Sequence, residues 1–248
     1  MWTPETLAII VFTFILAGFV KGVVGLGLPT VALALLTTLL GLNDAMVLML
    51  LPTFITNAWQ ALAGKALLEI LHRQWLLLAT ASLATITGTF FATFVNSALL
   101  LILLGAVLCL YSGISLFTPQ INLSRSGNSW LAPVTGLITG ILTGLTGTFV
   151  VPAVPYFQAL GLTRHVLVQT MGVWFTIATL SLGIGLNTNG LLSPDLAWLS
   201  AIAVVPALLG MWIGQRVRNR LPEQKFRAVF FTTLLVLGLY IATRAIVS

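Results

Sequence analysis

The sequence predicts an all-α membrane protein with several transmembrane helices, arranged as two pseudo-symmetric halves. Of its 248 residues, 58% are hydrophobic and only 6% are charged, and the mean hydropathy is +1.09. A soluble domain would need more polar residues to cover its surface, so this composition excludes that class. Apolar stretches of about 20 residues recur along the chain, the length needed to cross a hydrocarbon core of about 30 Å.

Hydrophobic runs and helix breakers divide the chain into ten apolar segments, five in each half. In the first half, residues 1–117, the segments are Glu5–Lys21, Leu28–Leu40, Asp44–Gly64, Trp75–Val95 and Ser97–Phe117. A polar linker, residues 118–129, separates the halves. In the second half, residues 130–248, the segments are Trp130–Thr143, Thr148–Leu160, Arg164–Leu186, Leu196–Gln215 and Phe226–Ala245.

The two halves resemble copies of one unit. The motif GFVKG at 18–22 corresponds to GLITG at 136–140, Thr56 corresponds to Thr176, and Trp75 corresponds to Trp198. These landmarks keep their order in both halves, which indicates an old internal duplication. We therefore expect two transmembrane repeats joined by the polar linker.

The distribution of basic residues predicts that the repeats are inverted. The loop after the third segment carries Lys65, His72 and Arg73, whereas the corresponding loop at 187–195 has no base. Conversely, the loop at 96–97 has no base, and its counterpart holds the cluster of Arg216, Arg218, Arg220, Lys225 and Arg227. Because basic loops stay on the cytoplasmic side, equivalent loops fall on opposite faces of the membrane. An inverted repeat of this kind is common in secondary transporters.

The second segment of each half is short for a membrane span. Leu28–Leu40 and Thr148–Leu160 each correspond to about 20 Å of helix at 1.5 Å per residue. We therefore expect each half to contain one re-entrant helical hairpin and three full spans, which gives the odd number of crossings that inversion requires. Non-helical backbone at membrane depth is tolerated only beside protein or a polar cavity. The breaks at 22–30 and 143–152 thus predict a cavity near the midplane.

Residue chemistry at the two breaks predicts a site for a small anion. Glycines leave backbone amides open to a ligand, Pro29 suits the first turn of the following helix, and Thr148 is a candidate N-cap. Helix N-termini that begin at the breaks favour anions, and Lys21 adds a full positive charge. The candidate substrate-binding residues come from both breaks and from the third segment of each half: Lys21, Gly22, Gly25, Gly27, Pro29, Thr30, Asn57, Thr143, Gly144, Thr146, Gly147, Thr148 and Gln169.

Structural roles stay open for all of these residues. The spacing of the glycines also fits close helix packing, and Lys21 could extend to the membrane interface from the end of a full span. Threonines in membrane helices often bond to their own backbone. Asn57 and Gln169, like the nearby Thr53 and Thr56, could link helices instead of binding a ligand.

The remaining polar residues exclude several other functions. All five acidic residues lie near segment ends or in loops, so no buried carboxylate is available as a proton relay. Cys109 is the only cysteine, which removes a disulfide or cysteine-based metal site. No catalytic, phosphate-binding or metal motif is present, so we expect neither an enzyme nor a cofactor. The basic cluster lies between apolar segments, which favours membrane orientation over binding of nucleic acid.

At the two breaks the sequence resembles the TauE/SafE family of sulfite and organosulfonate exporters, a group also described as toluene-sulfonate uptake permeases. The motifs that carry the resemblance are AGFVKGVVGLGLPTVALALL at 17–36 and TGLTGTFVVPAVPYFQALGL at 143–162. Length, duplicated halves and the polar linker extend it over essentially the whole chain. The resemblance implies transport of small sulfur-containing anions across a bacterial inner membrane.

The first break departs from the pattern of many relatives, which carry an acidic residue and consecutive glycines there. This chain has Lys21 and the sequence GLGLP, and the added positive charge favours an anionic ligand. We expect a secondary transporter that exports small anions, because an inside-negative potential favours their efflux by about 2.3 kcal/mol per charge per 100 mV. Its partners are then the anion and the lipid bilayer; the sequence gives no indication of oligomeric state. Two alternatives stay open: a non-transporting membrane scaffold or assembly protein, and an uptake permease for another small carboxylate or sulfur-containing anion.

Overall fold

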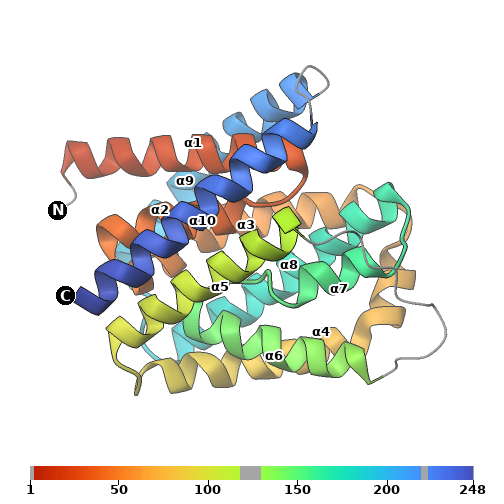
Figure 1. Cartoon of the computed structure of the whole chain (residues 1–248), viewed down its shortest axis with the longest axis horizontal. Coiled ribbons are helices and arrows are strands. Elements are labelled where there is room, and N and C mark those ends of the chain that lie inside the picture. Colours follow the sequence, from red (N-terminus) through yellow and green to blue (C-terminus); the bar gives the residue numbers. More distant parts are fainter. Residues whose placement is uncertain (1–2, 118–129, 219–222, 248) are drawn as a thin grey trace.

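A computed structural model describes residues 3–117, 130–218 and 223–247. Within these ranges the regular structure is entirely helical (Figure 1): α1 Pro4–Val24, α2 Leu28–Leu40, α3 Leu42–Leu62, α4 Leu67–Ala92, α5 Ser97–Phe117, α6 Leu131–Thr146, α7 Ala153–Ala159, α8 Arg164–Thr188, α9 Pro194–Val217 and α10 Glu223–Val247. Among the described helices, α1, α3, α4, α5, α8, α9 and α10 are long and apolar enough to span a membrane. The prediction of a polytopic helical membrane protein is confirmed. The predicted linker at 118–129 lies outside the described residues.

The short helix of the second half is the element that the sequence predicted least well. Helix was expected from Thr148 to Leu160, but α7 occupies only Ala153–Ala159, and its N-cap is Pro152 instead of Thr148. A helix that began at Thr148 would place Pro152 in its second turn, where proline removes a hydrogen bond and clashes with the preceding turn. The non-helical stretch between α6 and α7 therefore covers 147–152 and is longer than the gap at 144–147 between the predicted segments. The stretch between α1 and α2 covers 25–27 and is shorter than the predicted gap at 22–27, because α1 continues to Val24.

Two pairs of helices pack at backbone contact through glycines. On α1, a Cβ at Gly18 would lie 2.1 Å from the carbonyl oxygen of Ala207 on α9, and one at Gly22 would lie 2.3 Å from that of Met211. On α6, Gly136, Gly140 and Gly144 contact α4 in the same way, with Cβ positions 2.4 Å from backbone oxygens of Leu77, Ala81 and Thr85. The packing role that the sequence left open for Gly144 and Gly22 is thus present in the structure.

These contacts also set the directions of the helices. Successive glycines of α1 meet successive turns of α9, so these two helices run in the same direction, and α6 runs in the same direction as α4. Figure 1 shows α1 along one side of the molecule, α4 and α6 along the opposite side, and α3 and α8 between them. The first helix of each half therefore packs on the fourth helix of the other half. This is the pairing that two related repeats would produce, although the inverted repeat itself stays a prediction.

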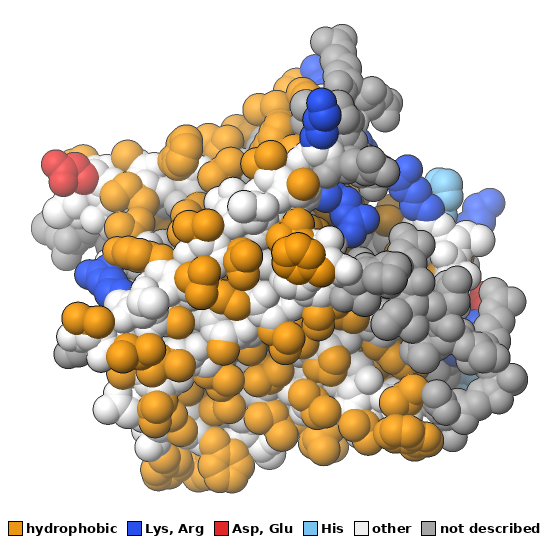
Figure 2. Space-filling view, viewed as in Figure 1, with side chains coloured by type: hydrophobic (Ala, Val, Ile, Leu, Met, Phe, Trp, Pro, Cys, Tyr) orange, Lys and Arg blue, Asp and Glu red, His pale blue; other side chains and the backbone are white. Residues whose placement is uncertain are grey.

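Basic side chains gather at one end of the molecule, where α1 and α9 end and α8 begins (Figure 2). We call this the basic end; Lys65, Arg164 and Arg218 lie there. At the other end, Asn189 of the α8–α9 loop lies close enough to Thr89 of α4 to donate a hydrogen bond of 3.4 Å. The loops that follow α4 and α8 therefore share one end, as the distribution of basic residues predicts.

A proline within α3 is accommodated by a side chain from α9. Pro52 has no N–H, so the carbonyl of Leu48 lacks its helical donor. The hydroxyl of Ser200 donates to this carbonyl at 2.8 Å and accepts from the N–H of Leu51 at 3.1 Å. The pair fixes α3 against α9 one turn before the polar residues of the site.

Candidate functional site

A cavity of about 610 Å³ opens at the basic end between α1, α3, α8 and α9. Its wall combines basic, amide and apolar side chains, including Lys21, Gln60, Arg164, Gln169, Arg218, Trp59, Met211 and Phe226. The backbone of the first break, from Gly22 to Gly25, forms part of the same wall. Among the described lining residues there is no aspartate or glutamate. The charged side chains that the structure describes in this wall are therefore basic.

Lys21 lies in the last turn of α1 and reaches the cavity from within the bundle. Only 3% of its surface is exposed, so its ammonium group is removed from bulk water. The Nζ atom donates to the hydroxyl oxygen of Thr56 at 3.1 Å and to the amide oxygen of Asn57. Both acceptors are neutral, and an ammonium has three donors. Among the described residues, two of these donors have acceptors and the third has none.

The two acceptors are oriented by the backbone of α3. The hydroxyl of Thr56 donates to the carbonyl of Pro52 at 2.7 Å, and the amide nitrogen of Asn57 donates to the carbonyl of Thr53 at 2.8 Å. Because their hydrogens are used within the helix, both residues present oxygen atoms to Lys21. The sequence identified Asn57 as a substrate-binding candidate; in the structure it holds the lysine.

Two glutamines in the cavity wall bind backbone groups of neighbouring helices. Gln169 on α8 donates to the carbonyl of Ala61 at 2.8 Å and accepts from the N–H of Ala66 at 3.0 Å. It thereby links the end of α3 to the start of α4 across the loop that carries Lys65. Gln60 on α3 donates in return to the carbonyl of Val168 at 2.6 Å. Gln169 thus lines the cavity and also links helices. From the sequence, the link between helices was the alternative to ligand binding.

The first break turns the chain at the edge of the cavity. Gly25 and Gly27 have φ angles of 89° and 108°, a left-handed conformation that other residues rarely adopt. Gly25 lines the cavity with Gly22. Pro29 lies in the first turn of α2, as predicted, and is buried with Thr30. These two residues and Gly27 do not line the cavity.

The second break lies deeper in the bundle, and none of its residues lines the cavity. The hydroxyl of Thr143 donates to the carbonyl of Thr148 at 2.8 Å, and the hydroxyls of Thr146 and Thr148 are 2.6 Å apart. These side chains therefore stabilise the break itself. Gly147 packs against Met46 of α3.

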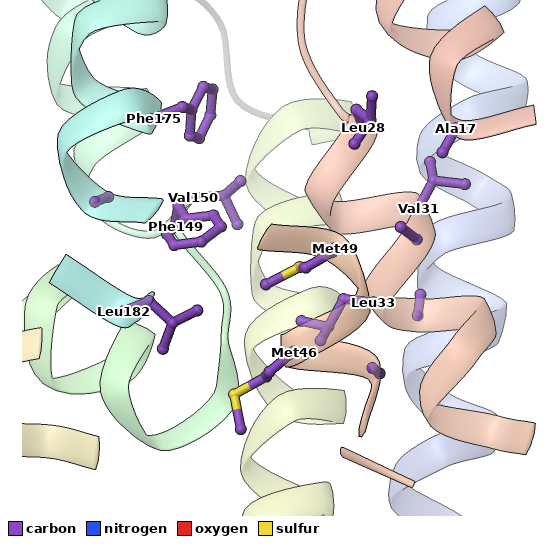
Figure 3. Packing of buried hydrophobic residues seen from close by; sticks show 14 of the residues in the cluster. Ala17, Leu28, Val31, Leu33, Met46, Met49, Phe149, Val150, Phe175 and Leu182 are labelled. Carbon is purple, nitrogen blue, oxygen red and sulfur yellow. The ribbon is translucent and has the colours of Figure 1, made fainter. Parts of the chain in front are cut away.

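Met46 and Thr56 lie about 15 Å apart along α3, at 1.5 Å per residue, so the two breaks contact different levels of this helix. An apolar cluster that includes Met46, Met49, Phe149 and Phe175 fills the region beside the second break (Figure 3). The structure thus brings Lys21, its two acceptors and the first break together around the cavity, but not the second break.

Comparison with protein families agrees with the motifs at the breaks. The family model for sulfite exporter TauE/SafE matches residues 10–241, nearly the whole chain. The chain belongs to the TauE/SafE family. Neither the curated proteins nor the solved structures include a match. A TauE/SafE chain with membrane-spanning helices is a transporter-type membrane protein.

Several cavity residues of this TauE/SafE protein were not identified from its sequence. Gln60 and Gln215 are amides inside otherwise apolar helices, which is a signal that could have been used. Trp59, Met211 and Phe226 carry no such signal, since large apolar residues are expected throughout a membrane protein. Arg218 was interpreted only as part of the orienting cluster, yet it lines the cavity.

Proposed function

We propose that this chain is a secondary transporter of small anions of the sulfite or organosulfonate class, and that the anion binds beside Lys21. One observation carries the proposal: among the described residues, the nearly completely buried ammonium of Lys21 bonds only to neutral oxygens of Thr56 and Asn57. A buried charge without a partner costs several kcal/mol, and ionisable residues at membrane depth are a functional signal. An anion in the cavity would supply the missing negative charge.

The rest of the cavity suits such a ligand. Arg164 and Arg218 lie in the wall at the basic end, together with His165, and the field of the two arginines would draw anions inward. A volume of about 610 Å³ lies within the usual range for small-molecule sites, roughly 300–1,000 Å³. Trp59, Met211 and Phe226 offer apolar surface for the organic part of a sulfonate.

Export is the direction that charge favours. We take the membrane to be a bacterial inner membrane. By the positive-inside rule, the basic end of the protein then faces the cytoplasm. The cavity is open at that end, so it would load from the cytoplasm. An inside-negative potential then favours release of an anion outside by about 2.3 kcal/mol per charge per 100 mV, without a coupling ion.

The second break fits this scheme as part of the path toward the other end. If the halves are inverted repeats, the opposite-facing state exchanges their conformations. Thr143, Gly144, Thr146, Gly147 and Thr148 would then border the cavity, as the first break does here. The sequence predicted one anion site formed by both breaks, which includes Gly27, Pro29 and Thr30. We propose that these residues, too, contact the anion only during the change to the opposite-facing state.

Anion flux in proteoliposomes tests the proposal with a matched pair of lysines. Lys21→Met keeps the length and packing of the side chain but removes its charge, whereas Lys65→Met removes an exposed charge outside the cavity wall. We expect Lys21→Met to lose sulfite or sulfonate flux and anion-induced thermal stabilisation, and Lys65→Met to keep both. Equal flux in wild type and Lys21→Met would refute the site.

Two outcomes would favour the other functions. If wild type shows neither flux nor thermal stabilisation with sulfite, sulfate, thiosulfate, sulfoacetate or aromatic sulfonates, the protein is a scaffold. If an imposed inside-negative potential accelerates uptake instead of efflux, it is an uptake permease.

A further inference from the structure

The charged side chains that the structure describes in the cavity wall are all basic. Lys21, Arg164, His165 and Arg218 line it, and the part of its wall that the structure describes holds no carboxylate. The other polar side chains there, Gln60, Gln169 and Gln215 among them, are neutral amides. A ligand with a negative group finds several donors. Among the described lining residues, a positively charged group on the same ligand finds no charged acceptor.

The residue at position 57 decides whether the charge of Lys21 has a negative partner within the protein. Its amide oxygen accepts from Nζ of Lys21 inside the bundle, and only 1% of its surface is exposed. Aspartate has the same shape, so a carboxylate there would form a buried ion pair with the lysine. Asparagine makes the same contact without charge and leaves the ammonium uncompensated.

We propose that the cavity selects anions that carry no positively charged group, and that Asn57 determines this selectivity by leaving the charge of Lys21 uncompensated. This proposal rests on the proposed function and adds the substrate class of the same site. A zwitterion would bind its anionic group to Lys21 and then place its cation in the same cavity. Repulsion between like charges is strong where water is excluded, as it is around the buried ammonium of Lys21. The aromatic rings of Trp59 and Phe226 attract cations weakly and oppose this selection.

Two sulfonates of equal size separate charge from shape. Butane-1-sulfonate and 3-aminopropane-1-sulfonate have the same number of non-hydrogen atoms and differ by a methyl in place of an ammonium group. Binding to the purified full chain is measured by titration calorimetry, and flux is measured in proteoliposomes, with sulfite as reference. We expect wild type to bind butane-1-sulfonate at least tenfold more tightly. Equal affinities, or preference for the amine, would overturn the proposal.

Variants of Asn57 test its role. Asn57→Asp should weaken butane-1-sulfonate at least tenfold and bring the affinities of the two probes within about twofold of each other. Asn57→Leu removes the acceptor without adding charge, so it should weaken both probes but keep their ratio. A ratio that Asn57→Asp leaves unchanged would refute the assignment. If Asn57→Asp does not fold, the wild-type ratio still decides the selectivity.

The sulfite reference separates this proposal from the proposed function. If sulfite binds and both sulfonates bind equally, only the selectivity fails. If sulfite binds and neither sulfonate does, the selectivity also fails, because the cavity then excludes the tail whatever its charge. If nothing binds, including sulfite, the proposed function fails.

Discussion

Replacing Gly18 with alanine tests the helix contact that positions Lys21. A Cβ at Gly18 would lie 2.1 Å from the carbonyl oxygen of Ala207, and Cβ atoms essentially never come within 3.0 Å of a heavy atom to which they are not bonded through the chain. This contact must therefore lengthen by at least about 0.9 Å, the difference between 3.0 and 2.1 Å, by moving α1 and α9 apart. Strain of this kind costs typically about 1–3 kcal/mol. Because Lys21 lies one turn further along α1, the shift should also disturb its hydrogen bonds.

The assay compares two glycines that both lie within apolar helices. A Cβ at Gly113 of α5 would have no atom within 4 Å, so Gly113→Ala should be neutral or stabilise the helix by up to about 1 kcal/mol. Unfolding in detergent reports stability, and anion-induced thermal stabilisation reports the site. We expect Gly18→Ala to lose both stability and anion response. If Gly18→Ala matches Gly113→Ala in both measurements, the proposed link between helix packing and the position of Lys21 is wrong.

Two further predictions concern α3 and the membrane topology. Ser200→Ala removes the hydroxyl that donates to the carbonyl of Leu48 in α3, so the free energy of unfolding should fall by about 1–3 kcal/mol. The control Ser181→Ala loses only a bond within its own helix and should lower the free energy of unfolding by less. Equal losses in the two variants would contradict the role of Ser200. In a background without Cys109, single cysteines at Ser97 and Asn189 should react with an impermeant thiol reagent from the same face of the membrane. Labelling from opposite faces would refute the inverted arrangement.

The sequence was sufficient to predict the class of fold because hydrophobic length follows directly from the bilayer thickness. The short helix α7 was the exception, because Pro152 delays the start of the helix to Ala153, and an apolar run alone does not show this. Pro29 was placed correctly in the first turn of α2, because proline is favoured at that position of a helix. At the two breaks, the positions of proline and glycine therefore predict where the helices begin better than hydropathy does.

The candidate site was predicted in part. Lys21 stood out because a basic residue inside an apolar segment is costly and rare. Its acceptors on α3 are Asn57 and its neighbour Thr56, and the sequence could rank them only as polar residues of a membrane helix. The contact depends on how α1 lies against α3, which no local pattern encodes. The same holds for Gln169, whose two backbone partners come from the end of α3 and the residue before α4.

The glycines of α1 and the lysine beside them have connected roles. Gly18 and Gly22 let α1 approach α9 at backbone distance, and Lys21 lies on the same turns but reaches α3. A bulkier residue at either glycine would move the helix and, with it, the charge. Close packing and the proposed anion binding are therefore compatible explanations of this motif, because the packing of α1 on α9 also sets where the ammonium of Lys21 lies beside α3.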